Sequence, residues 1–185
     1  MPGYGCAHMH VVRVAHTADL DPATLEAARA MVVEAFAGDF DASDWEHSLG
    51  GMHALAWEGE QIVGHASLIQ RRLLHGGRAL RTGYVEGVGV RADQRGRGVG
   101  GALMDPLERL LRGAYDLGAL GATDAGARLY ERRGWVRWRG PTSALTLSGI
   151  ERTADADGAV YVLPLGVPLD LDGELACDWR DGDVW

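Results

Sequence analysis

The sequence predicts an α/β fold in which a mixed, largely antiparallel β-sheet is flanked by helices. The first observation is a run of three strand-like segments, 52–57, 61–70 and 80–90, separated by turn residues at 58–60 and 76–77. Such short connections favour antiparallel neighbours. The second observation is the strand–helix–strand–helix pattern that follows, which is typical of a parallel pair. Together they predict one sheet with both kinds of pairing.

Length and composition indicate one ordinary globular domain spanning residues 1–185. Of its residues 46% are hydrophobic and 24% are charged, and no repeat or low-complexity linker divides the chain. No apolar run approaches the roughly 18 residues of a membrane span. The first ten residues lack the basic cluster and apolar core of a secretory signal, so we expect a cytoplasmic protein. Cys6 and Cys177 are therefore predicted to be unpaired thiols.

The first half of the chain begins with a strand at 10–15. Asp21 and Pro22 then predict the start of a helix whose apolar face includes Leu25, Ala28 and Met31. Residues 38–51 read as a loop with one short helical turn.

The second half continues the alternation of strands and helices. We expect a helix from Gly98 to Arg112 with Leu103 and Leu107 on its apolar face, and an acidic, irregular tail from 170 to 185. The other predicted elements are a strand at 116–120, a helix at 124–133 ended by Gly134, and strands at 143–147 and 160–163.

Charge is distributed unevenly along the chain. Residues 1–70 carry ten acids and two arginines, 71–139 carry seven acids and fourteen arginines, and 140–185 carry nine acids and two arginines. Each segment could simply be a solvated surface. A basic middle between acidic flanks also suits a protein that binds an anionic ligand with one part and a cationic ligand with another.

The glycine-rich turn at 95–101 allows three interpretations besides a plain loop. A Walker phosphate loop is excluded because the chain contains no lysine. A dinucleotide fingerprint is formally present at Gly96, Gly98 and Gly101, but five residues separate it from the preceding strand. The third interpretation is an anion cradle: backbone N–H groups at the start of the next helix face a pyrophosphate, and Arg95 and Arg97 add positive charge.

The pattern R-x-x-G-x-G, opening a helix after a V-x-V strand, resembles the acetyl-coenzyme A signature of the GCN5-related N-acetyltransferase (GNAT) superfamily, and "ARLYERRGW" resembles its second common motif. Further blocks extend the resemblance to the mycobacterial aminoglycoside 2′-N-acetyltransferases from about His16 to Trp185. They are "FAGDF", "DWEH", "LGGMHAL", "QRRL", "GYVEG", "RGAY", "LGAL", "GPTS" and "CDWRDGDVW". The resemblance implies the GNAT fold, acetyl-CoA as co-substrate and acetyl transfer to the 2′-amino group of a cationic aminoglycoside, an antibiotic-resistance activity.

The resemblance also implies roles for two side chains. Glu86 lies in a strand and would act as a general base on the amine through water, and Tyr130 would protonate the departing coenzyme A thiolate. Period-two alternation places Glu86 on one face with Val88 and Val90. The alternative for Glu86 is a solvent-facing acid on an edge strand, and the alternative for Tyr130 is a half-buried helix tyrosine without a catalytic role. A covalent acyl-enzyme is disfavoured because neither cysteine has a neighbouring His/Asp arrangement.

The co-substrate is expected to bind along the end of the strand at 80–90 and the glycine-rich turn at 95–101. Backbone amides would pair with the pantetheine arm, Gly87 and Gly89 suggest a bulge, and the Val88 N–H is our choice of oxyanion donor. The predicted cofactor-binding residues are Val88, Gly89, Val90, Arg95, Gly96, Arg97, Gly98, Val99 and Gly100.

A wall of carboxylates would select the several ammonium groups of an aminoglycoside. Gly121 and Ala156 depart from the pattern of close relatives, which leaves substrate breadth open. Trp185 should pack its indole and so fix the α-carboxylate beside Asp183. The resemblance places Asp39, Asp44, Glu86, Asp183 and the carboxylate of Trp185 in this wall, with Asp155 and Asp157 as weaker candidates. Gly87 and Gly121 complete the predicted substrate-binding residues.

Two other functions remain open at the level of the sequence: acetylation of another aminosugar, such as an intermediate of thiol or cell-wall metabolism, and acyl-CoA binding without catalysis. Nucleic acid and membrane partners are not expected, because coenzyme A accounts for the basic stripe and the flanks are acidic. The seven histidines show no metal-binding spacing, so no metal is expected. The superfamily resemblance implies a homodimer.

Overall fold

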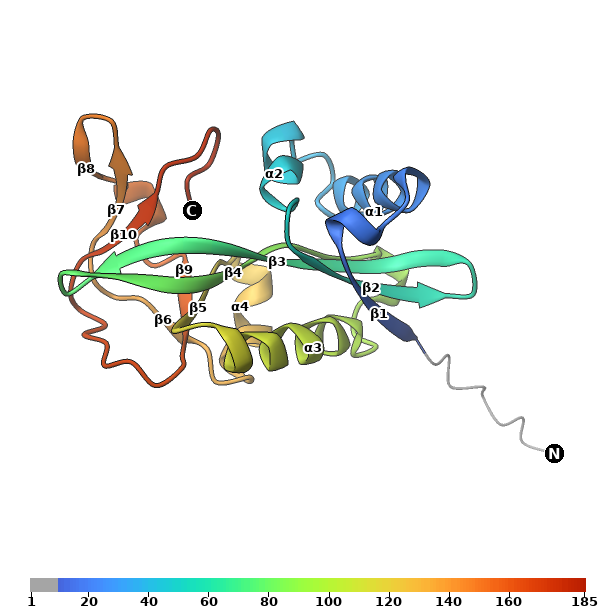
Figure 1. Cartoon of the computed structure of the whole chain (residues 1–185). Coiled ribbons are helices and arrows are strands. Elements are labelled where there is room, and N and C mark those ends of the chain that lie inside the picture. The colour runs from blue at the N-terminus through green and yellow to red at the C-terminus, as the bar shows by residue number, and fades with distance from the viewer. Residues whose placement is uncertain (1–9) are drawn as a thin grey trace.

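The computed structural model describes residues 10–185 as one ten-stranded sheet with helices on both faces (Figure 1). The fold class is the mixed α/β sheet that the sequence predicts. No helix in this part of the chain is long and apolar enough to cross a membrane. The strands are β1 Val11–His16, β2 Met52–Glu58, β3 Gln61–His75, β4 Arg78–Val90, β5 Leu117–Gly121, β6 Val136–Arg137, β7 Thr142–Thr146, β8 Gly149–Arg152, β9 Val160–Pro164 and β10 Leu175–Asp178; the helices are α1 Pro22–Ala35, α2 Ala42–His47, α3 Val99–Ala114 and α4 Asp124–Glu131.

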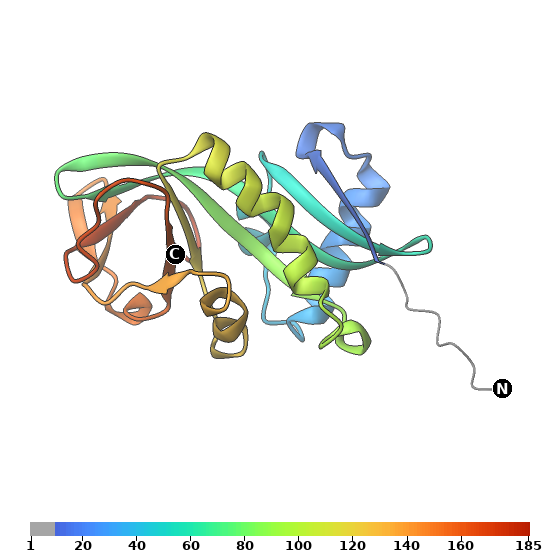
Figure 2. The same cartoon turned by 90° about the horizontal axis from the view of Figure 1, so that it is seen from below.

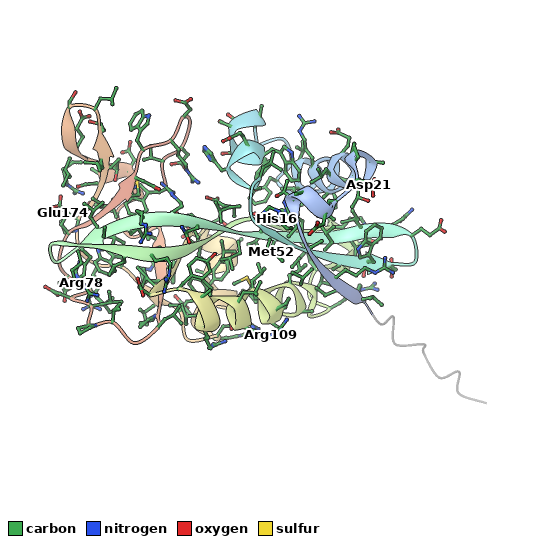
Figure 3. All side chains as sticks on the ribbon, viewed as in Figure 1. His16, Asp21, Met52, Arg78, Arg109 and Glu174 are labelled. Carbon is green, nitrogen blue, oxygen red and sulfur yellow. The ribbon has the colours of Figure 1, made fainter. Side chains whose placement is uncertain are left out.

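The long hairpin of β3 and β4 is the spine of the sheet. β2 pairs with the first half of β3 and β10 with its end, so both strands lie along the same edge of β3. The remaining order runs β6-β9-β5-β4 on one side and β10-β7-β8 on the other. Among the strands of residues 10–185, only β4 with β5 and β10 with β7 pair in parallel. Figure 3 shows the hairpin end, where Arg78 opens β4 and Glu174 immediately precedes β10.

The helices α1 and α3 cover opposite faces of the sheet, as Figures 1 and 2 show. Asp21 caps α1 by accepting a hydrogen bond from the Thr24 N–H, and Val32 of α1 is fully buried. On the other face, Leu103 and Leu107 of α3 have no exposed surface. Each helix therefore buries one apolar stripe, as the 3.6-residue period predicts.

The prediction of an irregular tail is wrong for residues 175–178. β10 inserts between β3 and β7, and its Leu175, Ala176 and Cys177 are almost completely buried. Four residues flanked by acids carry too little periodicity to be recognised as a strand from the sequence. The short strands β6 and β8 were missed for the same reason. The Cys177 thiol donates to the Val184 carbonyl oxygen, whereas Cys6 lies outside the described residues.

A β-bulge at Gly87 corrects the expected orientation of Glu86. Glu86 pairs with Ser67 and Gly89 with His65, so β4 contains one more residue than β3 across this step. Gly87 has φ +54°, a conformation that glycine adopts without a steric penalty. The extra residue reverses the alternation, so Glu86 shares a face with Gly89 and not with Val88 and Val90. The expectation of a bulge here is confirmed, and the expectation of one shared face is wrong.

The sheet opens on the other edge of β4. β5 pairs with β4 only from Thr82 to Tyr84, and beyond that point β5 pairs with β9 alone. The bulged end of β4 therefore has β3 on one side and no strand on the other. α3 begins nine residues after β4 ends, and α4 follows β5 directly. This opening in the sheet is where the candidate site lies.

Candidate active site

Two cavities meet at the opening in the sheet. One, of about 840 Å³, lies between the end of β4, the glycine turn and α4, and we call it the glycine cleft. The other, of about 430 Å³, is lined by α2, β4 and the residues after β10, and we call it the acidic pocket. Five residues line both cavities: Phe36, Val88, Thr123, Gly126 and Tyr130. A group bound in one cavity can therefore reach a group bound in the other beside Val88 and Tyr130.

The glycine cleft is built largely from backbone. Gly98 is the N-cap of α3, has φ +84° and makes no side-chain capping bond, so the first amides of the helix are left for a ligand. A Cβ atom at Gly98 would meet no protein atom within 4 Å. A helix N-terminus of this kind favours an anionic group. Of the predicted cofactor-binding residues, Val88, Gly89, Val90, Arg95, Gly96, Gly98, Val99 and Gly100 line the cleft.

The arginines of the glycine cleft differ from the expectation. Arg95 lines it, but its guanidinium donates to the carbonyl oxygens of Val90 (3.1 Å) and Ala35 (2.6 Å), so it also ties α1 to the end of β4. Arg97 is not among the lining residues. Arg132, which the sequence argument passed over, lines the cleft from the end of α4. Its signal was the "ERR" that follows Tyr130 in the second motif.

The acidic pocket gathers carboxylates from three distant segments. Asp39, Asp44, Glu86 and Asp183 line it together with Asp41, which the sequence argument did not select. Asp41 and Asp44 form a capping box on α2: Asp41 accepts from the Asp44 N–H (3.0 Å), and the Asp44 carboxylate accepts from the Asp41 N–H (2.8 Å). Both carboxylates are thus fixed by the helix they cap.

Glu86 is mostly buried, with 13% of its side chain exposed, and forms an ion pair with Arg180. Arg180 also donates from Nε to the Asp183 carbonyl oxygen (2.9 Å). Burial raises the pKa of the Glu86 carboxyl, and the Arg180 guanidinium opposes part of that rise. Sequence reasoning missed Arg180, whose only signal was being the single basic residue in an acidic tail.

Tyr84 lies beneath this ion pair. The guanidinium carbons of Arg71 and Arg180 lie 4.7 and 5.5 Å from the centroid of its ring. Its hydroxyl is buried and has no hydrogen-bond partner within the described chain. The ring thus supports the guanidinium that contacts Glu86, through cation–π contact.

Tyr130 is held on α4 at the junction of the two cavities. Its ring packs against Trp135 and Tyr161, with centroids 6.1 and 6.4 Å apart. The buried carboxylate of Glu108 accepts hydrogen bonds from Arg133 (2.7 Å) and the Trp135 indole (3.0 Å), which fixes the end of α4 on α3. Burial raises the pKa of the Tyr130 phenol, so it stays protonated at neutral pH.

The last residues of the chain fold back over the pocket. The Trp185 indole is buried and donates to Thr153 Oγ1 (2.7 Å), and the Trp185 N–H donates to the Asp183 carboxylate (3.1 Å). The backbone carbonyl of Trp185 lies 3.6 Å from where a Cβ atom on Gly121 would stand. His47 of α2 bonds the Asp181 carbonyl oxygen (2.7 Å), so α2 and the tail are joined across the pocket. The expected packing of the indole is confirmed.

Not every predicted substrate residue lies in the acidic pocket. Asp155 lines an adjoining cavity of about 580 Å³, which shares Gly121, Asp183 and Trp185 with the acidic pocket. Asp157, the other weaker candidate, is instead bound to Arg152 (2.7 Å) and to Thr142, which lowers the pKa of its carboxyl. It holds β7 and so has a structural role. Gly87 lines the acidic pocket as expected.

The geometry places a protonated phenol at the junction, a buried carboxylate on the side of the acidic pocket and open backbone amides on the side of the anion cradle. That arrangement suits the transfer of a group from an anionic donor to a cationic acceptor. Among residues 10–185 no three His, Cys, Asp or Glu side chains cluster as metal ligands.

Comparison with known proteins agrees with this geometry. The sequence profile of the acetyltransferase (GNAT) domain family matches residues 18–137. A curated aminoglycoside 2′-N-acetyltransferase of Mycolicibacterium fortuitum is 53% identical over 181 residues, covering 96% of this chain and 93% of that protein. The fold resembles that of an Escherichia coli GNAT protein, YhbS, in complex with CoA (16% identity, TM-score 0.63, 97% of this chain and 94% of that one). It also resembles a Brucella melitensis GNAT acetyltransferase in complex with acetyl-CoA (17% identity, TM-score 0.60, 94% and 98%).

Proposed function

The chain belongs to the GNAT acetyltransferase family, and from that premise we propose that it transfers the acetyl group of acetyl-CoA directly to the 2′-amino group of aminoglycosides. The observation that carries the proposal is the junction of the glycine cleft and the acidic pocket at Val88 and Tyr130. The 53% identical relative supports the aminoglycoside as acceptor.

The glycine cleft fits acetyl-CoA. The first amides of α3 at Gly98 would hold the pyrophosphate, and Arg132 at the mouth of the cleft would add positive charge. The edge of β4 that β5 leaves uncovered, from Val88 to Val90, would pair with the amides of the pantetheine arm as a neighbouring strand does. The bound acetyl-CoA would supply a thioester carbonyl at the junction.

Glu86 is proposed to prepare the attacking amine. A sugar amine is largely protonated at neutral pH, so a nearby base must remove its proton before attack. Burial raises the pKa of Glu86 and makes its carboxylate a better base, which receives the proton through a water molecule. The remaining ammonium groups would lie against Asp39, Asp44 and Asp183. Arg180 forms an ion pair with Glu86, and part of this ion pair must be replaced by the contact between Glu86 and the substrate.

Two further groups act on the thioester side. The N–H of Val88 would donate to the thioester oxygen as negative charge develops there. The Tyr130 phenol would then give its proton to the departing thiolate. Burial makes this phenol a weaker acid than in water, but the same dry surroundings also strengthen the thiolate as a base.

Turnover of acetyl-CoA against a panel of amines tests the proposal, with the acetylated position of each product mapped by NMR. Products acetylated at the 2′-amine support it, and turnover confined to non-aminoglycoside amines would refute it. Gly121 gives a reason to include other aminosugars, because it leaves space beside Trp185 and Tyr84 that a larger residue would fill. Three features stay predictions: that residues 1–185 form one domain, that the protein is a homodimer and that it is located in the cytoplasm.

A further inference from the structure

Two buried histidines connect the bulge on β4 to the far edge of β2. His65 Nδ1 lies 2.7 Å from the Gly87 carbonyl oxygen, and His65 Nε2 lies 2.9 Å from His53 Nδ1. His53 Nε2 in turn lies 2.8 Å from the Thr17 hydroxyl oxygen. Both imidazoles have no exposed surface, and the Trp45 ring packs against them. We call Thr17, His53 and His65 the histidine chain; the mechanism above uses none of the three.

The hydrogen bonds fix where the protons lie. The Gly87 carbonyl can only accept, so His65 must donate from Nδ1. A neutral His65 then accepts at Nε2, so a neutral His53 donates from Nδ1 and accepts at Nε2 from the Thr17 hydroxyl (2.8 Å). That hydroxyl has one proton, so in this arrangement it does not donate to the Gly51 carbonyl oxygen, 3.2 Å away, which accepts from the Thr17 N–H. Burial lowers the pKa of His53 to about 4 and that of His65 to about 3, so both rings are neutral near pH 7. The hydrogen bonds of the histidine chain therefore all run in one donor-to-acceptor direction, from Thr17 to the Gly87 carbonyl.

That carbonyl belongs to the peptide whose N–H is the proposed oxyanion donor. In a trans peptide the C=O of one residue and the N–H of the next point in opposite directions. Because the Gly87 C=O is directed at the His65 ring, the Val88 N–H points away from that ring. The edge of β4 opposite β3 is left open by β5 at this point. A Cβ atom at Gly87 would stand 2.9 Å from Ser48 Oγ and 3.3 Å from His65 Nδ1. The bulge is thus closely packed around this one peptide.

We propose that His65, supported by His53 and Thr17, is a positioning residue that orients the Gly87–Val88 peptide and so directs the Val88 N–H at the thioester oxygen. The inference rests on the proposed acetyl transfer for its catalytic meaning. The orientation itself depends only on contacts within the chain. Without the His65 donor this glycine-bearing bulge has other accessible orientations, and the amide would be misdirected.

The main test compares two substitutions of His65. His65→Leu nearly preserves the volume but removes the donor, whereas His65→Asn loses volume but keeps an N–H close to the position of Nδ1. We expect kcat to fall about 10- to 100-fold in His65→Leu, somewhat less than the loss of a whole oxyanion donor, with the KM for the amine and the Kd for acetyl-CoA changed less than about threefold. His65→Asn should recover most of kcat. A role in packing alone predicts the reverse order, with the smaller Asn more damaging.

A spectroscopic measurement tests the role of His65 independently of whether an aminoglycoside is the acceptor. Infrared difference spectra of acetyl-CoA carrying a ¹³C-labelled thioester carbonyl need no aminoglycoside. The carbonyl stretch of the bound thioester should lie below its value in water in the wild type and in His65→Asn, and should return toward that value in His65→Leu. If no aminoglycoside is acetylated, the proposed function fails, but this carbonyl shift still tests the histidine chain.

Thr17 provides a variant pair at the accessible end of the chain, should His65→Leu fail to fold. Thr17→Val removes the hydroxyl at nearly constant shape, and Thr17→Ser keeps it. We expect a two- to fivefold fall in kcat for Thr17→Val and none for Thr17→Ser, at unchanged acetyl-CoA affinity. Nitrogen-15 NMR of the histidines should show both rings protonated at Nδ1. A bare His65 Nδ1 in the wild type, or equal kcat and equal carbonyl frequency in folded His65→Leu and wild type, would overturn the inference.

Discussion

The glycine cleft and the acidic pocket lie side by side but are built in different ways. The glycine cleft takes its main features from one continuous segment, the end of β4, the turn and the start of α3, and offers mainly backbone groups. The acidic pocket takes side chains from α2, from β4 and from the tail, and α2 and the tail are more than 130 residues apart. A backbone cradle depends on which residues are glycine, whereas a side-chain pocket depends on which segments the fold brings together.

This difference has a consequence for mutation. Substituting a residue of the glycine cleft should affect only the binding of the anionic donor. Substituting a residue of the acidic pocket should affect only the binding of the amine or the transfer of its proton. Residues that act at the junction, Tyr130 directly and His65 through the Val88 amide, should affect the chemical step without changing either affinity.

The largest effect is expected for Glu86→Gln. Loss of the base should lower kcat/KM for the amine about 10²- to 10⁴-fold near neutral pH, in the range of general acid–base steps. Acetyl-CoA affinity, measured by calorimetry, should stay unchanged. Glu60→Gln, in the turn between β2 and β3, is the matched control. Wild-type turnover in Glu86→Gln across the pH range would remove Glu86 from the mechanism.

Gly98→Val should abolish the cradle. A valine is strained at φ +84°, and its side chain would block ligand access to the amides of α3. Losing two charge-assisted hydrogen bonds at about 1.5–3 kcal/mol each predicts at least a hundredfold weaker acetyl-CoA binding. Gly59→Val, at φ +61° in a hairpin turn, imposes similar strain away from the cleft and should leave this affinity intact. An unchanged acetyl-CoA Kd in a folded Gly98→Val protein contradicts the cradle.

Tyr130→Phe should lower kcat about a hundredfold, at the weaker end of general-acid effects because water can replace the phenol in part. The KM values of both substrates should change much less than kcat. Tyr115→Phe, at the end of α3 and outside both cavities, is the control. Steady-state kinetics decide the point: a rise in either KM with kcat intact would make Tyr130 a binding residue.

Asp183→Asn should raise the aminoglycoside KM about tenfold, because one charge-assisted contact to an ammonium group is lost. The KM for acetyl-CoA should not change, since Asp183 lines only the acidic side of the junction. Asp181→Asn, two residues earlier and outside the pocket, serves as the matched variant. Equal aminoglycoside KM values in the two variants would mean that the tail takes no part in recognition.

The smallest effect is expected for Arg180→Gln, and it concerns pH. Arg180 lowers the pKa of Glu86 and burial raises it, so removing the guanidinium should let Glu86 keep its proton to higher pH. Since the base must be a carboxylate, the acid limb of the kcat/KM profile should move to higher pH. Arg139→Gln, which loses an exposed ion pair with Asp172, should not shift that limb. A limb that stays or moves to lower pH contradicts the pairing.

The sequence by itself determined the features that depend on single residues and their near neighbours along the chain. The glycines after β4 predicted the cradle, because the conformation of Gly98 depends on its own lack of a side chain. Gly87 and Gly89 predicted a bulge for the same reason. The acids at 39–44 and 183 predicted a cationic partner, and the final Trp185 predicted a packed tail, since an indole gains most by burial.

Only the tertiary structure decided the contacts between distant segments. One inserted residue at the bulge moved Glu86 to the opposite face from Val88, a reversal that period-two alternation could not anticipate. Burial of β10 brought Arg180 to Glu86 across 94 residues of sequence. The pairing of β3 with β4 joined His65 to the Gly87 carbonyl through a bond that neither residue type implies. Local sequence specifies backbone conformation, whereas the partner of a buried charge or imidazole depends on which segments the whole fold packs together.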